Sequence, residues 1–210
     1  AAALGALYKG CPIGTLADVT VYSFNGNKTI TTGGGGMVVG SDGGLMKLIK
    51  HVTTTARVGA DYDHDRIGFN YRMTNIEAAM GCAQLERLDD FLAAKRRIRD
   101  RYDEAFAGHG KVSLFPRAAW AENGYWFSGV VLQKECDVPI DGLVEGLKAA
   151  GVVARKFWKP MHLQLPFREV PRRPLPVCEG LWTRVLTLPC STSLTDEDQG
   201  LVIDALNRLL

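Results

Sequence analysis

The chain has 210 residues, of which 46% are hydrophobic and 23% charged, and its formal net charge is +2. This composition is that of a globular protein and excludes disordered, collagen-like and low-complexity classes. No apolar run approaches the roughly 18 residues that a membrane-spanning helix needs. Because the net charge is small, we expect neither a nucleic-acid nor a membrane partner.

The sequence opens on alanine rather than methionine and carries no secretory or transit signal. We expect it to begin within a longer protein. Its five cysteines are odd in number and form no Cys-x-x-Cys pair, and its four histidines show no metal-ligand spacing. This pattern is typical of reduced thiols in a cytoplasmic protein that has no structural metal.

Two segments near the start, residues 18–24 and 37–39, are rich in β-branched and aromatic side chains and are predicted to be strands. Eleven of the 23 glycines lie within residues 1–44, which hold only four charged residues. Such charge-poor strands belong to a sheet that is covered on both faces, as in α/β proteins. Residues 1–74 contain too few elements to cover that sheet.

A short helix is predicted at residues 45–52 and is followed by a polar, irregular stretch, 53–74. Three aspartates at alternate positions from Asp61 to Asp65 resemble a calcium loop. However, Arg66 stands where that loop needs glycine, and Arg72 stands where it needs glutamate. We therefore exclude calcium and expect a solvated loop.

A long helical pattern covers residues 75–107, because apolar residues recur mostly every four positions and glycines follow it. Residues 86–104 hold twelve charges in nineteen positions. The interleaved bases permit a phosphate-binding patch, but a solvated helix face is the plainer interpretation.

The remaining chain alternates strands and helices around a proline-rich bend. Strands are predicted at 127–132, 152–158 and 185–188, helices at 141–150 and 177–182, the bend at 160–176, and a last helix after Thr195. Thr195 and Asp198 form a capping signature for that helix. Residues 86–210 are thus predicted to be a compact α+β unit with its own core.

Lys28 follows the end of a predicted strand, between small residues in the charge-poor segment. A lysine removed from water has a lowered pKa and a more nucleophilic amine, as Schiff-base chemistry with an aldehyde cofactor requires. Gly33–Gly36 would let the backbone approach a ligand and offer N–H groups to a phosphate, and Ser23 would add a hydroxyl. From these residues alone, an exposed lysine beside a flexible turn is an equal alternative.

Three blocks carry a family resemblance. The first runs from Ala3 to Met37 and contains Ser-Phe-Asn-Gly-Asn-Lys and Thr-Thr-Gly-Gly-Gly-Gly; the second is Gly-Phe-Asn-Tyr-Arg-Met-Thr-Asn-Ile-Glu-Ala-Ala at 68–79, followed by Gln84-Leu85-Glu86; the third is Trp-Lys-Pro-Met-His at 158–162. Together they resemble the DegT/DnrJ/EryC/StrS family of pyridoxal-phosphate (PLP) sugar aminotransferases, fold-type-I enzymes that aminate keto sugars on nucleotides. The first block is most similar to the branch that makes 4-amino-6-deoxy-N-acetylhexosamines in bacillosamine and legionaminic acid pathways.

The resemblance implies an α/β fold in which residues 1–85 are the C-terminal part of the large PLP-binding domain. Residues 86–210 would be the small α+β C-terminal domain. It also implies that roughly the N-terminal half of a family member is missing before Ala1, with the aspartate that pairs with the pyridine nitrogen. At Ala2 the family usually has a polar residue stacked near the ring. We therefore expect the 210 residues to be inactive alone.

The resemblance also implies roles for individual residues. Lys28 would bind the cofactor covalently and shuttle the proton, and Ser23 would bind the phosphate of pyridoxal 5'-phosphate. Asn70, taken as cofactor-binding, and Arg72, taken as substrate-binding, lie in a loop that in relatives reaches the cofactor phosphate or substrate diphosphate across a dimer interface.

Two residues of the third block are carried over as substrate-binding, Trp158 and His162, with the histidine near the sugar nucleotide. Without the resemblance, His162 would be interpreted as a packed loop histidine. In the first interpretation the His162 side chain contacts the substrate, and in the second it packs against the protein.

The implied function is transfer of an amino group from glutamate to a 4-keto-6-deoxy sugar nucleotide, a UDP-N-acetylhexosamine, in surface-polysaccharide or glycan biosynthesis. The implied partners are the nucleotide sugar, the amino-acid donor and a second copy in a homodimer with shared active sites. A GDP-perosamine-type or other nucleotide-sugar aminotransferase is the alternative. Related deoxysugar dehydratases carry histidine in place of the lysine, so Lys28 disfavours them. A truncated structural or interaction unit is the non-enzyme alternative.

Overall fold

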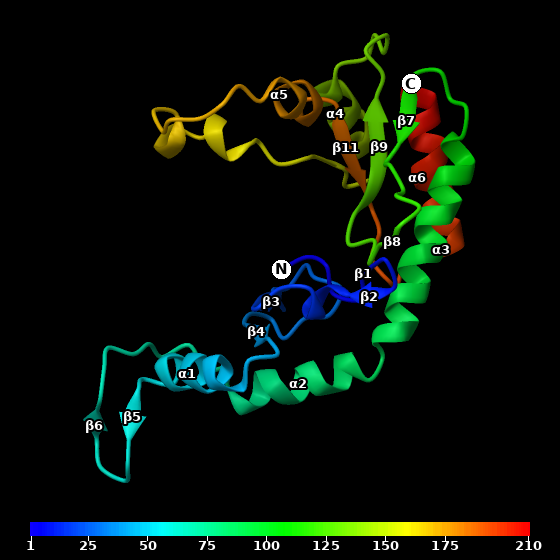
Figure 1. The fold of residues 1–210 in the computed structure, drawn as a ribbon. Helices are drawn as coiled ribbons and strands as arrows, with labels where there is room; N and C mark the ends of the chain where they lie inside the picture. The colour runs from blue at the N-terminus through cyan, green and yellow to red at the C-terminus, as the bar shows by residue number, and fades with distance from the viewer. The chain divides into compact units, whose positions relative to one another are not determined.

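The computed structural model describes residues 1–210, which divide into two compact units (Figure 1). The first unit comprises Ala1–Ala93 and Arg117–Trp126, and the second comprises Ala94–Pro116 and Phe127–Leu210. The division lies inside a helix, α3 (Leu88–Phe106). Assignment of residues 1–85 and 86–210 to a cofactor domain and a small domain stays a prediction.

The first unit contains three small antiparallel sheets. Strand β1 (Leu7–Tyr8) lies between β2 (Cys11–Pro12) and β8 (Ala121–Glu122), so the returning segment is bound to the start of the chain. The other two pairs are β3 (Thr20–Ser23) with β4 (Gly36–Val39), and β5 (Arg57–Val58) with β6 (Asp63–His64). Its helices are a 3-10 turn η1 (Ile13–Thr15), α1 (Gly43–Thr53) and α2 (Asn75–Leu85), with the first residues of α3.

The two strands predicted early in the chain are confirmed as β3 and β4. Their register places Ser23 opposite Gly36. A Cβ atom at Gly36 would lie only 2.4 Å from the carbonyl oxygen of Tyr22, so this pairing requires glycine. Val21 and Met37 remain 53% and 47% exposed, which leaves part of this ribbon uncovered in the chain.

The single long helix expected at residues 75–107 was wrong, because the structure forms α2 and α3 with a break between them. The apolar side chains of the two halves do not share one environment. Ile76 in α2 is 80% exposed, whereas Ile98 and Tyr102 in α3 are buried. Tertiary packing therefore overrides the local period of four. Thr74 and Glu77 start α2 with a capping box.

The second unit is built on one antiparallel sheet in the order β10-β11-β9-β7. Its strands are β7 (Val112–Leu114), β9 (Ser128–Leu132), β10 (Arg155–Lys156) and β11 (Val185–Leu188); its helices are the rest of α3, α4 (Ile140–Ala149), α5 (Pro176–Trp182) and α6 (Asp196–Leu209), with 3-10 turns η2 (Met161–Leu163) and η3 (Leu165–Phe167). Figure 1 shows α3 and α6 side by side, and the side-chain amide of Gln199 on α6 donates to the carbonyl of Ile98 on α3, 2.7 Å away.

The core of the second unit contains the buried apolar side chains of the sheet and of α3, α4 and α6: Ile98, Tyr102, Phe106, Val112, Val130, Leu132, Leu143, Leu147, Leu186, Leu188, Val202 and Leu206. Tyr102 also donates a hydrogen bond from its hydroxyl to the carbonyl of Pro189, 2.9 Å away. Burial raises the pKa of the Tyr102 phenol.

Two expectations for this unit need correction. The charged face of α3 is not fully solvated, because Lys95 and Arg99 are buried; Arg99 is paired with Asp103 at 2.6 Å. The strand expected at 152–158 is only β10, because the amide of Val152 still bonds to the carbonyl of Leu147 and closes α4. None of the described helices is both long and apolar enough to cross a membrane.

Candidate functional site

Lys28 closes the tight turn that follows β3. Its backbone amide donates to the carbonyl of Asn25 at 3.0 Å. Its Nζ atom lies 3.3 Å from the centroid of the Trp126 ring, and the indole Nε1 of Trp126 donates to the carbonyl of Asn27 at 2.7 Å. Partial burial lowers the pKa of the Lys28 amine. The structure thus places this lysine in a partly buried position against an indole ring, and its role toward a cofactor stays a prediction.

The segment after Lys28 is fixed to the body of the first unit. Ile30 is buried, and the amide of Thr32 donates to the carbonyl of Phe24 at 3.0 Å. The amide of Thr31 donates to the side-chain Oε1 of Gln84 on α2, at 3.1 Å. The loop that follows Lys28 is therefore held by hydrogen bonds within the first unit.

Ser23 lies at the end of β3 and lines a cavity of about 1110 Å³ within the first unit. Arg72 lines the same cavity, together with backbone and side-chain atoms of β3, β4 and α1. Lys28 and Asn70 are not among the lining residues. The structure therefore brings Ser23 and Arg72, whose side chains can both donate to anions, among the lining residues of one cavity.

The glycine run makes the turn between the loop and β4. Gly33 and Gly35 have φ values of +83° and +76°, a region that favours glycine. The amide of Gly33 donates to the Thr31 hydroxyl at 2.9 Å, and the carbonyl of Gly35 accepts from the amide of Phe24 at 3.0 Å. The run therefore serves the loop's own hydrogen bonds; its expected role toward a phosphate stays a prediction.

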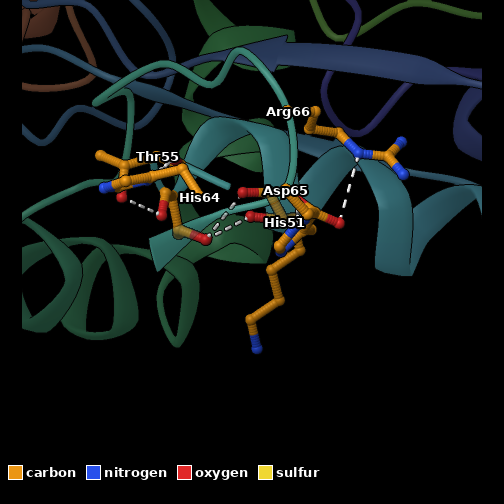
Figure 2. A network of polar contacts seen from close by, with 7 residues as sticks. His51, Thr55, His64, Asp65 and Arg66 are labelled. Carbon is orange, nitrogen blue, oxygen red and sulfur yellow. Dashed lines mark hydrogen bonds and ion pairs between the residues drawn. The ribbon is translucent and has the colours of Figure 1, made fainter. Parts of the chain in front are cut away.

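The polar loop after α1 is held by a cluster of hydrogen bonds and ion pairs (Figure 2). His51 Nε2 lies 2.6 Å from Asp65 Oδ1, and Asp65 Oδ2 lies 3.6 Å from Arg66 Nε. His64 Nδ1 lies 2.7 Å from the carbonyl oxygen of Thr55. The loop is therefore ordered by its own side chains, although the sequence predicted only a solvated stretch.

Asn70 and Arg72 follow this cluster and are exposed. Asn70 forms an isolated bridge with Thr54 through the backbone, and the structure shows no hydrogen bond or ion pair of either side chain within the chain. Tyr71, which lies between these two residues in the sequence, stacks its ring on that of Phe69 with centroids 5.1 Å apart, and Tyr71 is 73% exposed. This segment thus presents an aromatic pair, an amide and a guanidinium to the outside.

The third sequence block lies in the second unit. Trp158 lines an apolar cavity of about 830 Å³ with Phe157, Met161 and Trp182. His162 in η2 is not a lining residue; its side chain is largely buried, and its Nε2 lies 3.0 Å from Glu179 Oε1 on α5. This contact agrees with a packed histidine, and its expected substrate role stays a prediction.

Two contributors to the Lys28 loop were missed from sequence, Trp126 and Gln84. Trp126 lies 99 positions from Asn27, to which it bonds, so no local pattern connects them. Gln84 was part of the second block, but nothing in the sequence indicated that its side chain would bind the loop. Their positions come from the fold of the unit.

The comparisons with known proteins decide the family. The model of the DegT/DnrJ/EryC1/StrS aminotransferase family matches residues 1–207. The chain belongs to this family. It is 37% identical over 214 residues to EpsN of Bacillus subtilis, covering 100% of the chain and 55% of EpsN. It is 36% identical over 220 residues to the GDP-perosamine synthase of Caulobacter vibrioides, covering 100% of the chain and 57% of that protein.

Among solved structures, the PLP form of Spr1654 from Streptococcus pneumoniae matches with a TM-score of 0.90 and 25% identity. The match covers 100% of this chain and 57% of Spr1654. The fold expected from the three blocks is therefore confirmed. The chain spans about half the length of the curated relatives it matches.

Proposed function

We propose that the full-length protein is a PLP-dependent aminotransferase that acts on a nucleotide-bound keto sugar. The observation that carries this proposal is the environment of Lys28, whose amine is partly buried against Trp126 and has a lowered pKa. A free amine is the nucleophile that attacks an aldehyde. Membership of an aminotransferase family supports the same chemistry.

The residues present fit PLP. A covalently held aldehyde cofactor needs an amine with a lowered pKa, and its phosphate needs hydrogen-bond donors and positive charge. Lys28 would supply the amine, and Ser23, five residues before it at the end of β3, would supply a hydroxyl donor; the guanidinium of Arg72 is expected to come from the second copy. A PLP form is known for the relative Spr1654. When bound, this cofactor acts as an electron sink for the carbon that carries the amino group.

Lys28 has two tasks in this proposal. Its Nζ would hold the aldehyde of the cofactor between turnovers and, once released, would carry a proton between the cofactor and the sugar carbon that gains the amine. Both tasks need an uncharged amine at some point in the cycle. Burial of Lys28 favours that form, because it disfavours the charged one.

We further propose that the active sites are shared in a homodimer. Exposed Asn70 and Arg72 have no side-chain partner within the chain, and the exposed Phe69–Tyr71 pair beside them is an apolar surface. Contact with a second copy would cover this surface and bring the amide and guanidinium to the other copy's ligand.

The substrate is proposed to be a 4-keto-6-deoxy sugar nucleotide, with glutamate as amino donor and Trp158 and His162 among the substrate contacts. Two nucleotides are candidates. The first sequence block favours UDP-N-acetylhexosamine, whereas 36% identity to a GDP-perosamine synthase favours a GDP-hexose. Turnover of the purified full-length protein with both 4-keto sugars would rank them by kcat/KM. Equal absence of turnover with any keto sugar would remove the substrate class.

The experiment that tests the chemistry is reductive trapping. The full-length protein is incubated with PLP, treated with borohydride and digested, and the modified peptide is identified by mass spectrometry. We expect the label on Lys28. A label on other lysines alone, or none, would refute the proposed activity and favour the non-enzyme alternative, a structural or interaction unit.

A further inference from the structure

We propose that Trp126 is the positioning residue of Lys28: its indole face holds the free amine in place and shields one side of it from water, while its N–H fixes the turn. This proposal rests on the proposed function, because it concerns how the same lysine is kept ready to react. No sequence block includes Trp126.

The first support is the contact itself. The Nζ atom of Lys28 lies 3.3 Å from the centroid of the Trp126 ring. An ammonium within about 6 Å of an indole face is attracted by the ring, and the indole is the strongest of the aromatic partners. The ring also removes water from one side of the amine, since a flat apolar face occupies the space where water would bind. Position and hydration of Nζ thus depend on one side chain.

The second support is that Trp126 acts on the turn as well as on the side chain. Its Nε1 donates to the carbonyl of Asn27, the residue directly before Lys28, at 2.7 Å. A single indole therefore contacts the lysine at both ends, through the backbone preceding it and through Nζ. Gln84 binds the other side of the loop through the amide of Thr31. The lysine is held between these two anchors.

The third support is the backbone that presents Trp126. Tyr125 has a φ of +47°, which is unfavourable for a residue with a side chain. Gly124 is packed so closely that a Cβ would lie 2.6 Å from the carbonyl oxygen of Leu4. Arg117 lies over the Tyr125 ring, with its guanidinium carbon 5.3 Å from the centroid. The backbone that precedes Trp126 thus adopts an unfavourable conformation at Tyr125, and this conformation positions the indole.

The two effects of the ring on the amine have opposite signs. Attraction to the π face favours the charged amine, whereas loss of water favours the neutral one. For Lys28 the loss of water prevails, and burial lowers the pKa of its amine. Removal of the indole should therefore raise the pKa of Lys28 toward the value of 10.5 for an ordinary lysine.

The test uses full-length protein freed of cofactor. Lysine side chains are methylated with ¹³C-formaldehyde, and the Lys28 resonance is assigned by its loss in Lys28→Arg. An amine over an indole face should show an upfield ring-current shift. In parallel, the rate at which PLP and cyanoborohydride label Lys28 is measured against pH by mass spectrometry.

The variants are Trp126→Leu and Trp126→Phe, with Trp120→Leu as the matched control. Trp120 lies in the same returning segment but packs edge-on against Tyr8, with centroids 5.4 Å apart. We expect Trp126→Leu to abolish the upfield shift, to slow labelling at neutral pH about three- to tenfold, and to move the labelling midpoint to higher pH. Trp126→Phe keeps a ring but loses the bond to Asn27, so we expect a reduced upfield shift and an intermediate rate.

The outcomes separate the two proposals. If Lys28 of the unaltered protein is not labelled at all, the proposed function fails. If Lys28 is labelled but Trp126→Leu and Trp126→Phe match Trp120→Leu in shift, rate and midpoint, the role of Trp126 is refuted and the activity stands. A labelling midpoint that stays or falls in Trp126→Leu also refutes it. Should Trp126→Leu not fold, as judged by circular dichroism, Trp126→Phe decides.

Discussion

The imidazole Nε2 of His51, near the end of α1, lies 2.6 Å from the carboxylate Oδ1 of Asp65, which follows β6. This contact joins the helix to the far arm of the loop (Figure 2). The hydrogen bond from His51 is the largest cause that lowers the pKa of Asp65 below its ordinary value of 3.8. The ionised carboxylate is therefore favoured by the folded loop.

The sign of this linkage gives the first prediction. Because the folded pKa of Asp65 is lower than the unfolded one, the contribution to stability is complete above pH 3.8 and is lost as the pH falls through the folded value. We expect amide exchange in residues 54–70 to increase, relative to α2, as the pH is lowered through this range. Asp65→Asn should show faster exchange already at neutral pH and little further change with acid. An identical acid response in Asp65→Asn would contradict the assignment.

The second prediction concerns Lys28. In the full-length protein, Lys28→Ala should abolish transamination while leaving the fold intact, since no other group would bind the cofactor aldehyde and move the proton. The expected loss is at least about a thousandfold, as for removal of a nucleophile that is also the general base. Turnover, cofactor absorbance and circular dichroism are measured together. Retained turnover with unchanged absorbance would exclude Lys28 as the catalytic residue.

Much of this fold could be predicted from local patterns. β-Branched side chains are frequent in three segments that were predicted to be strands, and the structure has strands in each of them: residues 18–24, 127–132 and 185–188. The Thr195 cap signature is confirmed, because its side chain accepts a hydrogen bond from the amide of Asp198 at 3.0 Å. These features depend on residues that are neighbours in the sequence, which is why they can be predicted from one sequence alone.

The features that were missed depend on distant pairing. Strand β1 has only two residues and exists because Leu7 and Tyr8 pair with β2 and with Ala121–Glu122 far along the chain. No propensity marks so short an element. Similarly, burial of Arg99 follows from Asp103 and from the carbonyl of Phe115, to which its guanidinium donates. Composition alone indicated an exposed charged face.

The third prediction tests the shared active site. Arg72→Ala and Asn70→Ala should each weaken binding of the cofactor phosphate or substrate diphosphate, because a charged or polar donor to an oxyanion is removed. If the loop reaches the other subunit, a mixed dimer of Arg72→Ala and Lys28→Ala retains one intact site. We then expect about a quarter to a half of the unaltered activity after mixing, with each variant alone inactive or strongly impaired.

The control for that experiment is a mixture of Lys28→Ala with Ser23→Ala. Ser23 and Lys28 should serve the same site from the same chain, so a mixed dimer of these two variants has no intact site, and we expect no recovery of activity. The distinguishing variant is the double Lys28→Ala, Arg72→Ala chain mixed with unaltered protein, which should leave no intact site in a mixed dimer. Full activity of that mixture per unaltered chain would indicate sites built within one chain.

The residues of the candidate site, like the elements of the fold, fall into those that a local sequence pattern indicates and those that it does not. Lys28 and Ser23 are singled out by the sequence because the order Ser-x4-Lys and the following glycines lie together, and their roles stay predictions. Trp126 and Gln84 could not, since each reaches the loop from another segment. The roles of Asn70, Arg72, Trp158 and His162 remain predictions, because they concern ligands or a second subunit.

The last prediction concerns the glycine opposite Ser23. A Cβ at Gly36 would lie 2.4 Å from the carbonyl oxygen of Tyr22, so Gly36→Ala must separate β3 from β4 or shift their register. We expect a cost of about 1–3 kcal/mol, as for other forced insertions into packed structure. Gly26→Ala is the matched control, because a Cβ at Gly26 meets no atom within 4 Å and its backbone is not left-handed.

Amide exchange of residues 20–23 and 36–39 in the full-length protein measures the local opening free energy, and PLP titration measures the effect on the site. Gly36→Ala should raise exchange in both strands and weaken PLP binding, since Ser23 loses its fixed place at the strand end, whereas Gly26→Ala should leave both measurements near those of the unaltered protein. Equal exchange in the two variants would mean that the β3–β4 pair adapts to a side chain at Gly36 without cost.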